Sequence, residues 1–180
     1  MPAESTRGTN TLPLQHEFSK HATCFSTFDI PCYGPHYRKH EEVVDFFETT
    51  IMYNARLPTF SWLAKHDITP SNSTTYTLAD FEAALKAEYG ATPYVGCSGP
   101  RYNETTEGAG LLDNGRTQVS EMWYYFHVNG RPQEGNSVAV ERTGSSSCAK
   151  SEGAIHYYER ASGSVRKSGP SKGDGTAAGY

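Results

Sequence analysis

The order of its hydrophobic periodicities is the feature that most constrains the fold of this chain. After Pro35, apolar and aromatic residues recur at three- and four-residue steps, which predicts a helix with one buried stripe: Tyr37, His40, Val44, Phe47 and Ile51. Between residues 122 and 128 the period is two instead: Met122, Tyr124, Phe126 and Val128 alternate with Trp123, Tyr125 and His127. This pattern predicts a strand whose two faces can both make contacts. Helices first and antiparallel strands later indicate an α+β domain.

Shorter signals predict the remaining elements. Thr77-Leu78-Ala79-Asp80 resembles a capping box and should begin a helix that ends near Tyr89, with Gly90 as its left-handed end. Asn129-Gly130 is a turn signal. The other expected elements are helices at about 15–25 and around 61–64, strands at 92–97, 138–140 and 155–158, and a loop over 98–118.

The ends of the chain differ in composition from its body. Residues 1–13 and 161–180 are polar and should form a disordered lead-in and a disordered tail, which leaves one domain over residues 14–160. The 180 residues are enough for one hydrophobic core and too few for two domains. No stretch approaches the roughly 18 apolar residues of a membrane span.

Charge limits the kind of nucleic-acid contact that the chain can make. The formal net charge is -4, and the 16 lysines and arginines are scattered along the chain. This argues against a protein that grips nucleic acid through a broad basic face. A nuclease is not excluded, because it needs only a few cations at one cleft.

The four cysteines stand at positions 24, 32, 97 and 148, with no C-x-x-C pair and no histidine pair at finger spacing, so no structural zinc site is expected. Asn72-Ser73-Thr74 and Asn103-Glu104-Thr105 are glycosylation sequons. Together these features favour an extracellular, secreted glycoprotein. The sequence from Met1 shows no apolar signal-peptide region, and this mismatch predicts that the chain is incomplete.

Residues 16–24 carry the strongest chemical signal. In a helix, His16 and Lys20 are one turn apart, as are Glu17 and His21, and the four side chains fall within about 140° of arc. An imidazole titrates near pH 6.5 and can exchange a proton with a ribose hydroxyl, while an ammonium stabilises charge on phosphorus. The patch therefore suits a phosphodiester. The alternative is an ordinary solvated face with weak ion pairs.

His16-Glu17 begins the pattern H-E-x-x-H, which is typical of zinc proteases. Lys20 stands where that pattern needs its second histidine, and His21 is rotated about 140° from His16. The geometry does not suit zinc, so no metal and no cofactor are predicted.

The segment His16–Cys24 resembles the second conserved segment of the ribonuclease T2 family, (W/F)-x-H-E-(W/F)-x-K-H-G-T-C. The resemblance covers about residues 14–158, and its fungal branch is similar at 24–33, 68–71, 93–97 and 124–126. Ala22 replaces the family's glycine. Alanine suits a helix there, unless the backbone must adopt a positive φ.

The resemblance implies a fold and a role for each residue of the motif. The expected fold has helices packed on an antiparallel sheet, with the N-terminal part of the domain missing. His21 would be the general base on the ribose 2′-hydroxyl, Glu17 and Lys20 would stabilise the phosphorane, and His16 would bind phosphate. The implied enzyme is a secreted, monomeric endoribonuclease that cleaves single-stranded RNA without a metal. Its products are 2′,3′-cyclic phosphates and then 3′-phosphates.

The family pattern also pairs Cys97 with Cys148 in a disulfide. Cys24 and Cys32 would pair with upstream cysteines that are not among these residues, and here are expected to be free or paired with each other. The family's first conserved segment, typically H-G-L-W-P, supplies the acid for the leaving 5′-oxygen and lies near most of the base-binding residues. Only 15 residues precede His16, and none is a histidine.

We therefore expect a T2-type endoribonuclease represented without its N-terminal half, with reduced or absent activity. The other histidines match no catalytic position: His36, His40, His66, His127 and His156. One alternative is a catalytically dead remnant that acts as an RNA- or protein-binding module. Another is a secreted binding protein with no link to RNA.

Overall fold

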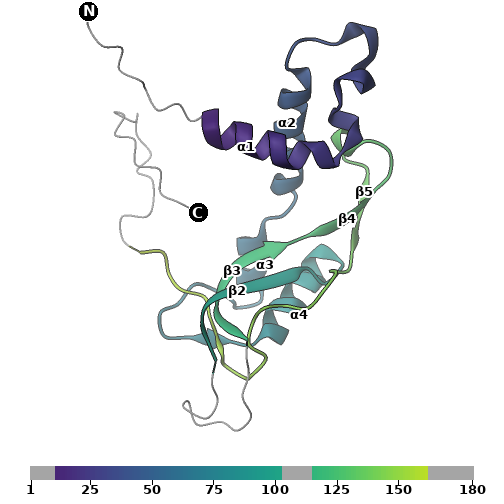
Figure 1. The fold of residues 1–180 in the computed structure, drawn as a ribbon. Coiled ribbons are helices and arrows are strands. Elements are labelled where there is room, and N and C mark those ends of the chain that lie inside the picture. The colour runs from purple at the N-terminus through teal and green to yellow at the C-terminus, as the bar shows by residue number, and fades with distance from the viewer. Residues whose placement is uncertain (1–10, 103–114, 162–180) are drawn as a thin grey trace, which may run out of the picture.

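The computed structural model describes residues 11–102 and 115–161. Its helical elements come mainly from the first half of the chain (Figure 1): α1 (Thr11–His21), α2 (Glu41–Ala55), α3 (Thr59–Lys65) and α4 (Leu78–Tyr89), with 3₁₀ turns at Ala22–Cys24, Ser26–Phe28, Ile30–His36 and Pro132–Glu134. The first helix begins inside the predicted lead-in, whereas residues 1–10 and 162–180 lie outside the described residues. None of the described helices is long and apolar enough to cross a membrane.

The strands form two small sheets. The larger has the order β1-β6-β3-β2 and consists of β1 (Thr75–Tyr76), β6 (Ile155–His156), β3 (Arg116–Trp123) and β2 (Tyr94–Arg101). The second is an antiparallel pair of β4 (Tyr125–Val128) and β5 (Ser137–Val140). The α+β class is confirmed. The larger sheet is mixed and not wholly antiparallel as expected, because β3 and β6 run parallel.

Helix α4 begins and ends where the sequence predicts. The Thr77 hydroxyl accepts a hydrogen bond from the Asp80 N–H, and the Asp80 carboxylate accepts one from the Thr77 N–H, each at 3.0 Å. Two otherwise unpaired amides of the first turn are thereby satisfied. Gly90 ends the helix in the left-handed region, with a φ of 92° that a side chain would disfavour.

The main hydrophobic core lies between α3, α4 and the larger sheet. Phe81 and Leu85 of α4 are fully buried against Val95 of β2 and Ile155 of β6, and Leu63 of α3 closes the same cluster. In a strand, alternate residues point to opposite faces, so the burial of Val95 identifies the face of β2 that packs on α4. The opposite face of β2 points away from the core.

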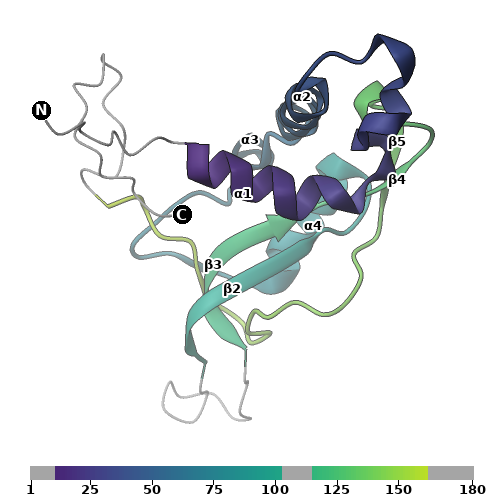
Figure 2. The same cartoon turned by 45° about the horizontal axis from the view of Figure 1, so that its top comes forward.

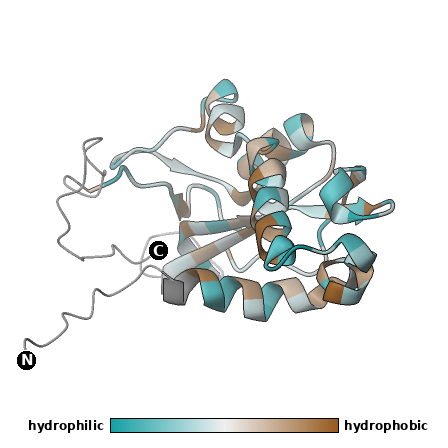
Figure 3. Ribbon diagram, turned by 90° about the horizontal axis from the view of Figure 1, so that it is seen from above, coloured by the Kyte–Doolittle hydropathy of each residue, from teal (hydrophilic) through white to brown (hydrophobic). Residues whose placement is uncertain are grey.

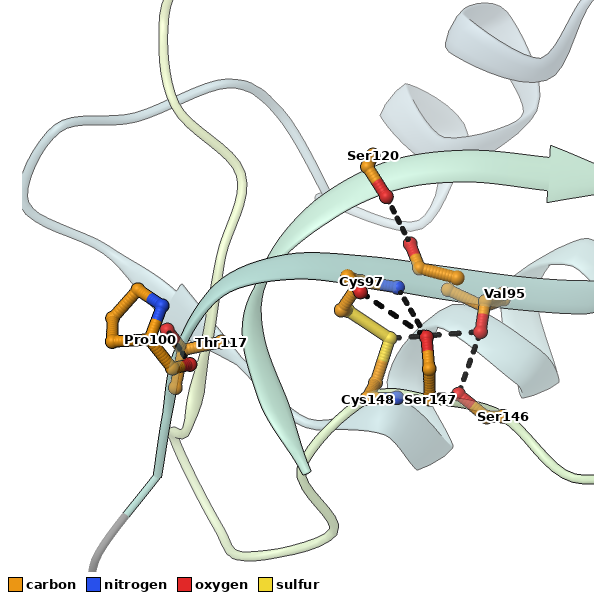
Figure 4. Close-up of a disulfide and its surroundings, with 9 residues drawn as sticks. Val95, Cys97, Pro100, Thr117, Ser120, Ser146, Ser147 and Cys148 are labelled. Atoms are coloured by element: carbon orange, nitrogen blue, oxygen red, sulfur yellow. Dashed lines mark hydrogen bonds between the residues drawn. A yellow bond between two sulfur atoms is a disulfide. The ribbon is translucent and has the colours of Figure 1, made fainter. Parts of the chain in front are cut away.

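A disulfide between Cys97 of β2 and Cys148 joins the sheet to the C-terminal segment at the edge of this core, with Cα atoms 4.8 Å apart (Figure 4). Two serines beside it bond to the same strand: Ser146 Oγ donates to the Val95 carbonyl at 2.6 Å, and Ser147 Oγ accepts from the Cys97 N–H at 2.9 Å. Cys24, in the 3₁₀ turn after α1, carries an exposed free thiol.

The buried stripe predicted after Pro35 is wrong. Helix α2 begins only at Glu41, because His40 adopts a left-handed φ of 69° and separates it from the 3₁₀ turn that contains Pro35. Val44 and Ile51 are 53% and 67% exposed. The inward face is set by other positions: Glu42 is buried and accepts a hydrogen bond from the Tyr37 hydroxyl at 2.7 Å, and Phe46 packs on aromatic rings.

The single strand predicted at 122–128 is two strands in different sheets. Tyr124 separates β3 from β4, and its hydroxyl is 2.7 Å from that of Thr59 while its ring packs on Tyr89 with centroids 4.9 Å apart. Burial raises the pKa of the Tyr124 hydroxyl. The predicted loop 98–118 is also too long, since β2 extends to Arg101 and β3 begins at Arg116, with residues 103–114 outside the described part.

Candidate active site

Helix α1 is attached to the rest of the molecule by one apolar edge. Phe18 packs edge to face on Phe46 of α2, with ring centroids 5.6 Å apart, and Ala22 follows one turn later with 2% of its surface exposed. Phe28, at the end of the next 3₁₀ turn, meets Phe46 at the same centroid distance. Figure 3 shows that hydrophilic and hydrophobic positions alternate along α1.

Alanine at position 22 fits this backbone. Among the described residues, the non-glycine residues with a positive φ are His40 and Asp67, so Ala22 is not in the left-handed region. Its small side chain is buried beside Phe18 and Phe28 at the base of α1. The departure from the family's glycine therefore needs no strained conformation.

The four ionisable side chains of the motif point away from this apolar edge. His16, Glu17, Lys20 and His21 are all exposed. Glu17 Oε2 lies 3.5 Å from His21 Nε2, and these two side chains are 54% and 55% exposed. Helical spacing puts Lys20 beside them and His16 one turn before Lys20. The structure thus places all four predicted residues on one solvent-accessible face of α1.

The end of the helix adds to the electrostatics of this face. Lys20 and His21 lie in the last turn, where the helix dipole is negative and favours cationic groups. Thr23 Oγ1 donates to the Lys20 carbonyl at 3.5 Å, and the chain continues as a 3₁₀ turn. A cation, an imidazole and a carboxylate therefore sit together on an open surface that an anionic substrate can reach.

The other histidines of the described chain lie elsewhere. His66 Nε2 is 3.3 Å from Glu88, whose pKa is lowered mainly by the hydrogen bond from Lys65. The ring of His156 stacks on Tyr158 with centroids 5.0 Å apart. His127 is exposed on β4. The described residues include no group of three or more histidine, cysteine, aspartate or glutamate side chains arranged to hold a metal ion.

Sequence reasoning missed an apolar cavity of about 610 Å³ between α2 and the second sheet. Phe28, Phe46 and Tyr53 line one side, and Tyr124 and Phe126 line the other. The residues come from distant parts of the chain, and no periodicity within one element could have grouped them. The cavity shares Phe46 with the contact that anchors α1.

Comparison with known proteins agrees with the motif. The model of the "Ribonuclease T2 family" matches residues 4–131. Ribonuclease Trv of Hypocrea rufa is 38% identical over 133 residues, which cover 74% of this chain and 49% of that protein. Ribonuclease M of Aspergillus phoenicis is 38% identical over 149 residues, which cover 82% of this chain and 54% of that protein.

A solved structure shows the same fold. Actibind, a T2 ribonuclease, superposes with a TM-score of 0.66 at 35% sequence identity, and the match covers 81% of this chain and 53% of Actibind. The chain thus spans about half the length of these three relatives. The matching family model, the identity to two fungal ribonucleases and the shared fold lead to one conclusion: the chain belongs to the ribonuclease T2 family.

Proposed function

We propose that this chain carries the His21 part of the active site of an endoribonuclease that cleaves single-stranded RNA. The observation that supports the proposal best is the Glu17–His21 pair, with 3.5 Å between carboxylate and imidazole on an exposed helix face that also carries Lys20. The family to which the chain belongs supplies the reaction class.

The reaction would be a metal-free transphosphorylation. Glu17 faces Nε2 of His21, so Nδ1 is the nitrogen left to take the proton from a ribose 2′-hydroxyl. The 2′-oxygen then bonds to phosphorus, and the bond from phosphorus to the 5′-oxygen breaks. Lys20, and His16 one turn before it, would stabilise the charge on the five-coordinate phosphorus. Water later opens the 2′,3′-cyclic phosphate to a 3′-phosphate.

The leaving 5′-oxygen needs a proton from an acid. In the family this acid is a histidine of the H-G-L-W-P segment, which does not occur in residues 1–180. Loss of a general acid typically slows such a reaction by about 10²–10⁴-fold. We therefore expect residues 1–180 alone to cleave RNA weakly, with water in place of the acid.

The test is to incubate purified chain 1–180 with polyuridylate at about pH 5 and to measure the rate at which cyclic-phosphate ends form. His21→Ala should abolish the weak cleavage, and Glu17→Gln should reduce it. His127→Ala removes an exposed imidazole on β4 and serves as the matched control, which should keep the parent rate. If His21→Ala cleaves as fast as the parent, the assignment is wrong. RNA retention with no cleavage would instead support the RNA-binding remnant.

A further inference from the structure

Four residues share the outer face of the β2–β3 ribbon. Val95 and Cys97 face the core, so Tyr94 and Gly96 face the opposite way. The strand register pairs Tyr94 with Trp123 and Gly96 with Glu121. In the view of Figure 2, α4 lies behind this ribbon and α1 crosses in front of its end, so the outer face is on the same side as α1.

Two of these side chains form an aromatic pair, in which Trp123 is exposed and Tyr94 is half-buried. The rings of Tyr94 and Trp123 lie with centroids 5.3 Å apart and a 45° tilt, and Trp123 is 53% exposed. The indole Nε1 donates a hydrogen bond to Glu121 Oε2 at 3.1 Å. Because the polar edge of the indole is already bonded within the protein, its exposed part is chiefly aromatic surface.

Gly96 makes room for this arrangement. A Cβ at position 96 would lie 2.5 Å from Cγ of Glu121 and 2.9 Å from Cε1 of Tyr94. Both distances are shorter than any normal contact, so a side chain here would displace Glu121 or Tyr94. The bare backbone of Gly96 lets Glu121 lie across the strand, where it reaches the indole of Trp123.

We propose that Tyr94 and Trp123 form a stacking platform for one unpaired base of single-stranded RNA, an inference that rests on the proposed function. Proteins bind unpaired bases by stacking them on aromatic side chains, often on the face of a sheet. The Glu121 carboxylate repels phosphate, so the platform receives a base and not the backbone. Arg116 is exposed at the other end of β3, where its guanidinium donates a hydrogen bond to the Gly99 carbonyl at 2.6 Å, and it supplies a cation for the backbone.

The test measures RNA binding without cleavage. The probe is a fluorescently labelled hexa-adenylate whose 2′-hydroxyls are methylated, which removes the attacking oxygen. Fluorescence anisotropy gives its affinity for chain 1–180 and for Trp123→Leu. Stacking on an aromatic side chain contributes about 1–3 kcal/mol per base, so Trp123→Leu should weaken binding about 5- to 150-fold. Phe60→Leu, which removes a ring that is 59% exposed on α3, is the matched control and should bind like the parent.

Two further variants test the geometry. Gly96→Ala should weaken binding less than Trp123→Leu, because it disturbs the platform without removing the indole. Glu121→Gln keeps an acceptor for the indole N–H and removes a negative charge, so it should bind RNA as tightly as the parent or tighter. In Trp62→Phe, Trp123 is the remaining tryptophan, and its fluorescence should be quenched by the RNA probe at saturation.

Parent-like affinity of Trp123→Leu would overturn the proposal. So would quenching by a neutral oligosaccharide of glucose or N-acetylglucosamine but not by RNA, which would identify a carbohydrate site. The result is separable from the proposed function. His21→Ala should lose cleavage and still bind the probe, whereas Trp123→Leu should raise the RNA concentration needed for half-maximal cleavage in proportion to its loss of probe affinity.

Discussion

Phe46 of α2 holds Phe18 of α1 by an edge-to-face contact with ring centroids 5.6 Å apart. The same ring meets Phe28 at an equal distance and Phe47 at 5.1 Å. One aromatic side chain therefore supports both the helix that carries His21 and the turn that follows it. The ionisable face of α1 depends on this contact for its position, although none of its own residues takes part.

Replacement of Phe18 tests that dependence. Phe18→Ala removes a half-buried ring and its edge-to-face pair, which should lower the free energy of unfolding by about 2 kcal/mol. Urea unfolding followed by circular dichroism measures the change. Phe60→Ala is the control, because that ring is 59% exposed and its loss should change stability by no more than about 0.5 kcal/mol. Equal effects of the two changes would show that Phe18 does not anchor α1.

The Cys97–Cys148 disulfide should be a large contributor to the stability of the folded chain. It joins residues separated by 51 positions, and closing a loop of that length restricts the unfolded chain by about 4 kcal/mol. We expect the double change Cys97→Ser and Cys148→Ser to lower the free energy of unfolding by up to that amount. Cys24→Ser removes an exposed free thiol and is the comparison variant, which should unfold at the parent's urea midpoint. A double variant as stable as the parent would contradict the assignment.

Glu141 should make stability sensitive to acid. Hydrogen bonds from Thr92, together with Lys86, lower the pKa of its carboxyl from 4.5 to about 2. Because the folded pKa is the lower one, the stabilisation is fully present above pH 4.5 and is lost as the pH falls towards about 2. The difference in urea midpoint between parent and Glu141→Gln should be constant above that range and shrink within it.

The matched control is Glu152→Gln, which removes an exposed carboxylate outside this contact. It should leave the acid sensitivity of the parent unchanged. A midpoint difference for Glu141→Gln that stays constant down to about pH 2 would show that the Thr92 and Lys86 contacts do not act on folding.

Sequence was most informative where the determinants are local. Thr77, Asp80 and Gly90 fix both ends of α4 through contacts within a few residues, and those boundaries were predicted correctly. The spacing of residues 16–21 likewise determines that four ionisable side chains share a face once the segment is helical. Their catalytic roles remain predictions that the cleavage assays test.

Sequence failed where tertiary structure selects among similar patterns. Val44 and Ile51 formed a plausible buried stripe, but the left-handed residue His40 shifts the start of α2, and the inward face uses Glu42 and Phe46 instead. The alternating pattern around Tyr124 also gave no sign that the chain passes there from one sheet to the other. The Tyr94–Trp123 pair depends on a register between two strands that no local pattern specifies.

The separation of α1 from the main core affects how the molecule comes apart. The core cluster of α3, α4 and the larger sheet contains no residue of α1, which is held by Phe18 and Ala22 against a layer of aromatic rings. Release of α1 therefore exposes little of that core and needs only a sub-global opening. Amide hydrogens of α1 should exchange with solvent before those of α4, and heat or denaturant should scatter the His21 site while most of the fold is still intact.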